Sequence, residues 1–70
     1  MALSARNQIT GTVKSVTKDG IMAEVVVTLK GGDEVVSVIT AASADSLGLA
    51  EGKEVTVVVK STAVMLQNNE

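Results

Sequence analysis

Apolar and polar residues alternate through much of this chain, and this two-residue period limits its fold more than any other feature of the sequence. In the clearest run, residues 21–29, every second residue is apolar: Ile21, Ala23, Val25, Val27 and Leu29. Successive side chains of a β-strand point to opposite faces, so this pattern predicts a strand with one buried face.

The same period predicts four further strands, over residues 9–14, 34–40, 55–60 and 63–66. Glycine-containing turn signals separate the strands at residues 18–20, 30–33 and 51–53. Residues 41–49 break the alternation, and we expect a short helix that begins near Ser43 and ends at Gly48. The chain therefore predicts one all-β domain over residues 1–70, a five-stranded OB-like Greek-key barrel with a short helix between strands 3 and 4.

The strand expected over residues 34–40 is apolar on both faces, because Val36 and Val38 alternate with Val35 and Ile39. Such a strand is either well covered at the centre of a sheet, or it contacts another subunit or an anion-lined interface. The chain also has no aromatic residue, no Cys and no Pro, so its core contains only small side chains without a covalent link. Because small domains bury little apolar surface, we expect an obligate homo-oligomer.

Residue types that the chain lacks exclude many functions. Without Cys or His there can be no usual zinc site, no haem ligand from His, and no Ser–His or Cys–His nucleophilic pair. A net charge of -2, a single Arg and no aromatic residue argue against nucleic acid as a partner. No apolar run is long enough for a membrane span or a signal peptide. We therefore expect a cytoplasmic binding protein that is not an enzyme, requires no cofactor and has no membrane partner.

Three clusters of hydrogen-bond donors could form a site: residues 4–8, residues 60–62 and residues 40–43. None of the three contains a carboxylate. Sites that are rich in donors and poor in acceptors suit small oxyanions, which need charge-assisted hydrogen bonds and free backbone N–H groups. The residues alone leave simpler interpretations open, namely a solvated N-terminal arm, a turn between strands and a helix N-cap.

The residues Ser4-Ala5-Arg6-Asn7-Gln8 and Lys60-Ser61-Thr62 resemble the molbindins, which are small molybdate-binding Mop proteins. The similarity extends over residues 3–66 and includes Ile39-Thr40, Leu47-Gly48-Leu49 and Glu51-Gly52. It implies an OB-like barrel that assembles as a homohexamer, a trimer of dimers, and holds molybdate or tungstate between subunits. The metal would be bound as an oxyanion, with no protein atom coordinated directly to it.

The resemblance also implies which residues bind the oxyanion. One subunit would supply Ser4, Ala5, Arg6 and Asn7, its neighbour would supply Lys60 and Ser61, and Thr40 and Ser43 would add further donors. The implied function is reversible binding for intracellular molybdenum storage or homeostasis. Two alternatives from other classes remain: an OB-fold nucleic-acid module, and a purely structural oligomer in which these residues stabilise the interface.

Overall fold

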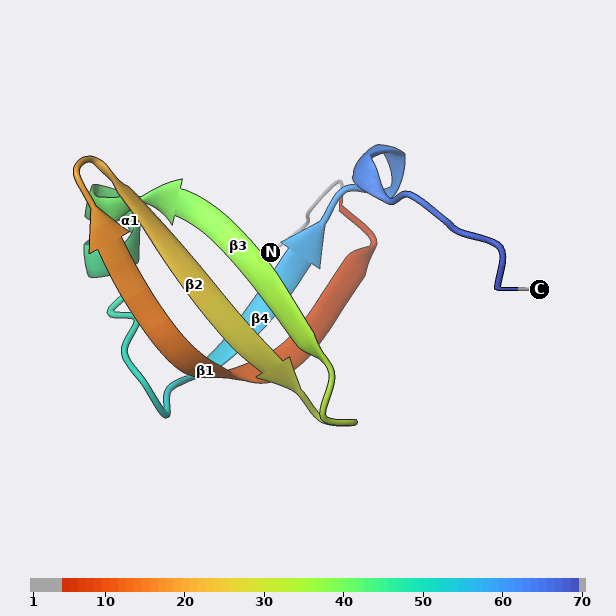
Figure 1. The fold of residues 1–70 in the computed structure, drawn as a ribbon, viewed down its shortest axis with the longest axis horizontal. Coiled ribbons are helices and arrows are strands. Elements are labelled where there is room, and N and C mark those ends of the chain that lie inside the picture. The colour runs from red at the N-terminus through yellow and green to blue at the C-terminus, as the bar shows by residue number, and fades with distance from the viewer. Residues whose placement is uncertain (1–4, 70) are drawn as a thin grey trace.

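The computed structural model describes residues 5–69, which form one curled antiparallel sheet with a short helix beside it (Figure 1). The elements in chain order are β1 (Asn7–Asp19), β2 (Met22–Leu29), β3 (Glu34–Thr40), α1 (Ala41–Ser46), β4 (Glu54–Val59) and the 3-10 turn η1 (Ser61–Ala63). The strands lie in the order β3-β2-β1-β4, and each neighbouring pair is antiparallel. This arrangement confirms the predicted all-β class and the helix between the third and fourth strands.

The core is small and lies on the inner face of the curled sheet. Its fully buried cluster consists of Val13 from β1 with Val25 and Val27 from β2. The predicted inward face of the second strand is therefore confirmed at its centre. Ile21 is the exception, with 80% of its surface exposed, because it lies in the two-residue turn that joins β1 to β2. Gly20 precedes it with φ of 62°, a conformation that glycine adopts without steric cost.

The longest strand, β1, pairs with both β2 and β4 and thereby links the two halves of the sheet. Its register against β2 shifts between Val13 and Ser15, which marks a β-bulge. Bulges bend a strand and increase its twist, and they help a sheet to curl. At Gly11 the neighbouring strand approaches so closely that a Cβ atom would lie 2.8 Å from the backbone oxygen of Thr28.

Helix α1 begins earlier than the sequence predicted. Thr40, the last residue of β3, is its N-cap, and the Thr40 hydroxyl accepts a hydrogen bond of 3.0 Å from the backbone N–H of Ser43. The expectation that the helix begins near Ser43 is therefore wrong, because the strand leads directly into the helix with a capping hydroxyl at the junction. The predicted end at Gly48 is confirmed, since this residue has φ of 65° and its N–H donates to the carbonyl of Asp45.

The fifth strand predicted over residues 63–66 is absent from the described part of the chain. After β4, η1 turns the chain away from the sheet, and residues 64–69 pair with no strand (Figure 1). Val64 is extended, and its N–H donates to the carbonyl of Ser61 within η1 rather than to a strand. Met65 and Leu66 are consequently 92% and 94% exposed. A segment forms a strand only where it can pair with another strand, and an alternating apolar pattern alone does not provide that pairing.

Strand β3 lies at the edge of the sheet, so the interpretation of residues 34–40 as a central strand is wrong. Its outward-facing Val36 and Val38 are 58% and 61% exposed. Within residues 5–69, β3 and β4 do not pair with each other, so the curled sheet stays open between these two edges, as in the partly open barrel of an OB-like fold. The predicted OB-like fold is therefore confirmed, with four strands in the sheet instead of five. The same residues contain no helix with the length and apolar character needed to cross a membrane.

Candidate functional site

Two of the three predicted donor clusters meet at one corner of the sheet. Asn7, the first residue of β1, lies opposite Val59, the last residue of β4. Arg6 directly precedes Asn7, and Lys60 directly follows Val59. The antiparallel register therefore brings together two cations that lie near opposite ends of the sequence.

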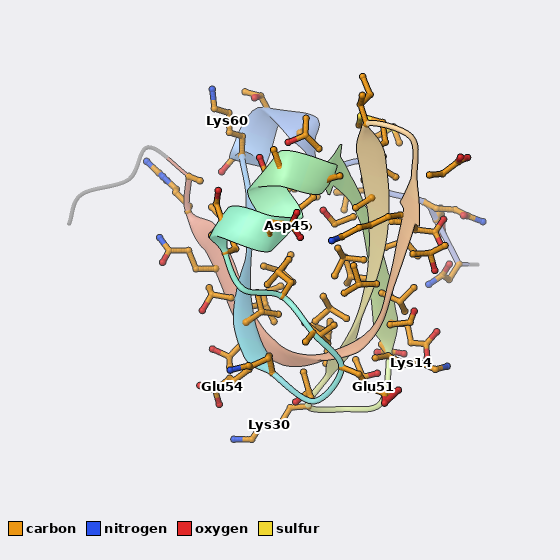
Figure 2. The ribbon with its side chains drawn as sticks, turned by 90° about the vertical axis from the view of Figure 1, so that its left-hand side faces the viewer. Lys14, Lys30, Asp45, Glu51, Glu54 and Lys60 are labelled. Atoms are coloured by element: carbon orange, nitrogen blue, oxygen red, sulfur yellow. The ribbon has the colours of Figure 1, made fainter. Side chains whose placement is uncertain are left out.

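The corner contains a hollow of about 410 Å³ that is open to solvent. We call it the donor hollow, and it is lined by Arg6, Lys60, Ser61 and Thr62. Both cations and both hydroxyls are without an ion pair or side-chain hydrogen bond to any other residue of the range 5–69. Figure 2 shows Lys60 extending outward, at the opposite end of the molecule from Glu51 and Glu54. The donor hollow therefore has positive charge, free donors and no carboxylate among its lining residues.

Local contacts fix the backbone on both sides of Arg6. The side chain of Ala5 is buried, and its carbonyl accepts a hydrogen bond of 3.3 Å from Nε2 of Gln8. Nδ2 of Asn7 donates to the carbonyl of Val59, also at 3.3 Å. On the other strand, η1 is closed by the N–H of Ala63, which donates to the carbonyl of Lys60 at 2.9 Å. The structure thus brings together Ala5, Arg6, Asn7, Lys60 and Ser61 of the predicted site.

The resemblance implied that a neighbouring subunit supplies Lys60 and Ser61. In the structure these residues already lie beside Arg6 of the same chain. Thr62 also lines the hollow and was absent from the predicted binding residues, although the donor cluster of residues 60–62 was the signal that could have identified it. Ser4 lies outside the described residues.

The structure does not bring Thr40 and Ser43 to the donor hollow. The Thr40 hydroxyl donates to the Ser43 hydroxyl at 2.8 Å, and Thr40 caps the first turn of α1 by accepting from the N–H of Ser43. Figure 1 shows α1 and η1 at opposite ends of the molecule. Within one chain these two residues stabilise the start of α1. They could reach an anion in the donor hollow only from another subunit.

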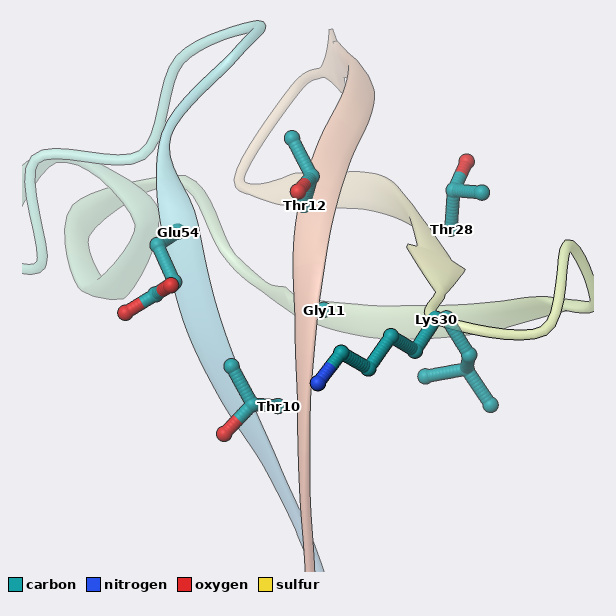
Figure 3. A pocket seen from close by; sticks show the side chains of 7 residues that line it. Thr10, Gly11, Thr12, Thr28, Lys30 and Glu54 are labelled. Atoms are coloured by element: carbon teal, nitrogen blue, oxygen red, sulfur yellow. The ribbon is translucent and has the colours of Figure 1, made fainter.

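A second hollow lies on another part of the surface and has a different chemistry. Its lining consists of Thr10, Gly11, Thr12, Thr28, Leu29, Lys30 and Glu54. Figure 3 shows the Lys30 side chain reaching toward Gly11, with Glu54 across the hollow on β4. The carboxylate makes this hollow less suitable for a dianion than the donor hollow. No group of three or more His, Cys, Asp or Glu residues that could hold a metal ion occurs among the described residues.

Comparison with known proteins identifies the family of the chain. The family model of the TOBE domain matches residues 3–66. Molybdenum-pterin-binding protein 3 of Clostridium pasteurianum is 50% identical over 66 residues, which cover 94% of this chain and 97% of that protein.

Two solved structures share the fold. A molybdate-binding protein from Sporomusa ovata superposes with a TM-score of 0.92 at 38% identity, covering 97% of this chain and 100% of that one. The cytoplasmic molybdate-binding protein ModG, solved with molybdate bound, gives a TM-score of 0.84 at 41% identity, covering 87% of this chain and 43% of that one. These likenesses span nearly the whole chain, and the chain therefore belongs to the TOBE domain family and, within it, to the Mop proteins.

Proposed function

We propose that this protein binds molybdate reversibly, as an intact oxyanion, at the donor hollow. The observation that carries the proposal is the hollow itself, in which Arg6, Lys60, Ser61 and Thr62 present unpaired donors and no acceptor carboxylate. A tetrahedral dianion needs charge-assisted hydrogen bonds from several directions, and these side chains provide them. The similar proteins are named for the binding of molybdenum-pterin or molybdate, which supports this choice of anion.

Each residue would have a distinct role in binding. Lys60 and Arg6 would supply positive charge, and the Ser61 and Thr62 hydroxyls would donate hydrogen bonds to the anion oxygens. Ser4 and the backbone N–H groups near Ala5 would add donors from the N-terminal arm. An anion held only by charge and hydrogen bonds is released unchanged, so the proposal includes no catalytic step and no resident cofactor. Tungstate has the same shape and charge as molybdate and would bind in the same way.

The proposed functional form is a homohexamer, a trimer of dimers, with anions held between subunits. Single chains leave Val36 and Val38 exposed on an edge strand, and they leave Met65 and Leu66 almost fully exposed. Assembly with other subunits would bury this exposed apolar surface. Participation of Thr40 and Ser43 in a site also requires a second subunit, because they lie at the other end of the chain's fold.

The proposed physiological role is cytoplasmic storage and homeostasis of molybdenum. Reversible binding without chemistry suits a store or buffer, which must return its ligand unaltered. The description of ModG as a cytoplasmic molybdate-binding protein supports the location.

Isothermal titration calorimetry with molybdate, with sulfate as a parallel control, tests the binding proposal. Lys60→Ala should weaken molybdate binding strongly. The matched variant Lys53→Ala removes the same charge from a turn remote from the hollow, and it should bind like wild type. Equal affinity in the two variants would exclude Lys60 from the site, and no binding by wild type would refute molybdate as the ligand.

Native mass spectrometry of the same samples tests the assembly. A hexamer that gains discrete molybdate masses supports an interfacial site. A hexamer that never gains anion supports the structural-oligomer alternative, and a monomer would refute the proposed assembly. A salt-dependent shift of labelled single-stranded DNA would instead favour the nucleic-acid alternative.

A further inference from the structure

One side-chain hydrogen bond joins the residues next to Arg6 and Lys60. Nδ2 of Asn7, the residue directly after Arg6, donates to the carbonyl of Val59, the residue directly before Lys60, at 3.3 Å. The two residues are also opposite each other in the β1–β4 register, at the last position of the ladder. Strand ends fray more readily than strand centres, so a cross-strand bond at this position fixes the point where both cations leave the sheet.

This bond has a specific electrostatic consequence. Arg6 and Lys60 line one hollow and repel each other when no anion lies between them, and neither has a carboxylate partner within residues 5–69. A site with fixed donors binds its ligand more tightly than one that must be ordered on binding, because the ordering cost is already met. The hydrogen bond from Asn7 to Val59 acts on the backbone and not on the anion. It therefore holds the charges of Arg6 and Lys60 in place before the anion binds.

From this arrangement we propose that Asn7 is a positioning residue, which sets the separation of Arg6 and Lys60 through Val59, rather than a direct ligand of the oxyanion. This inference rests on the proposed oxyanion binding. The amide nitrogen of Asn7 is directed at the opposite strand, and the bond is partly buried. Gln8 provides a second, local tie, since its Nε2 donates to the carbonyl of Ala5 on the other side of Arg6. Two neighbouring side-chain amides thus hold the backbone around the only Arg of the chain.

The test compares Asn7→Ala with Asn69→Ala, which removes an amide side chain of the same size from the exposed C-terminal tail. We expect Asn7→Ala to raise the dissociation constant for molybdate about fivefold, the effect of losing one intramolecular hydrogen bond, and Asn69→Ala to leave it unchanged. Gln8→Ala removes the hydrogen bond to Ala5 and leaves Asn7 in place, and it should also raise the dissociation constant for molybdate.

Hydrogen exchange in the molybdate-free protein separates positioning from direct ligation. In Asn7→Ala, exchange should accelerate about fivefold at Val58 and Val59, at the end of β4, and stay unchanged at the centre of β2. Weaker binding with unchanged exchange would make Asn7 a direct ligand and overturn the inference. Faster exchange with unchanged affinity would make it purely structural, which also overturns it. Absence of molybdate binding by wild type would refute the proposed function, and this inference with it, whereas the other two results refute the inference alone.

Discussion

Replacement of Gly11 by Ala should destabilise the protein, because the sheet has no space for a side chain at this position. A Cβ atom there would lie 2.6 Å from Cγ1 of Val27 and 2.8 Å from the backbone oxygen of Thr28. Val27 is itself a buried core residue, so its side chain cannot simply rotate into solvent. The Thr28 oxygen belongs to the backbone of β2, and it can move only if the paired strands separate locally.

The expected cost follows from that geometry. Overpacking a core position typically costs about 1–3 kcal/mol. The upper half of this range is appropriate here, because one of the two contacts is with backbone. In a domain of this size 1 kcal/mol lowers the melting temperature by about 4–8 °C, so Gly11→Ala should melt roughly 10–20 °C below wild type.

Thermal unfolding followed by circular dichroism would measure the difference at a fixed protein concentration, because association changes apparent stability. Gly31→Ala is the matched control, since the turn there is open and a Cβ atom would meet nothing within 4 Å. That substitution should be neutral or stabilising by about 0.5 kcal/mol, through the reduced entropy of the unfolded chain. Equal melting temperatures for the two variants would refute the argument from close strand approach.

Three further predictions concern the rest of the fold. Thr40→Ala removes the N-cap of α1 and should cost about 1 kcal/mol in urea unfolding, whereas the neighbouring Ala41→Ser should cost less; equal losses would exclude the capping role. Met65→Asp combined with Leu66→Asp should reduce the oligomeric mass measured by light scattering at matched concentration, and an unchanged mass would show that these exposed side chains lie outside any interface. Lys14→Ala breaks the exposed ion pair with Glu34 and should cost at most about 1 kcal/mol, an effect that salt should diminish; a larger, salt-independent loss would contradict a screened surface pair.

The sequence predicted those parts of the fold that depend on local patterns. The strand over residues 34–40 has the bounds that its apolar pattern and the preceding glycine turn indicated. The C-terminal residue of the helix followed from Gly48, because few other residues adopt a positive φ at that position. Its start was misplaced because both Thr40 and Ser43 are good N-cap residues, and only the end of the strand decides between them.

Features that depend on long-range pairing could not be read from the pattern. Residues 63–66 have the composition of a strand, yet residue 63 belongs to η1 and residues 64–66 pair with no strand of their own chain. The meeting of Arg6 and Lys60 depends on the register of β1 against β4, which no local signal specifies. Likewise, the donor capacity of Asn7 was evident from the sequence, but its hydrogen bond to the carbonyl of Val59 becomes visible only in three dimensions.

The small core and the exposed donor hollow would both be stabilised by burial against a second subunit. Water around a solvent-exposed cation pair screens its attraction for an anion, and the attraction strengthens when a second surface excludes that water. The apolar side chains left uncovered on β3 and after η1 would gain free energy from the same event, because burial removes their surface from water. In the proposed hexamer, one assembly step would therefore both complete a core that a single chain leaves small and lower the dielectric around Arg6 and Lys60. Molybdate, by neutralising two cations that otherwise repel each other, would in turn stabilise the assembled state, so that binding and assembly would be thermodynamically linked.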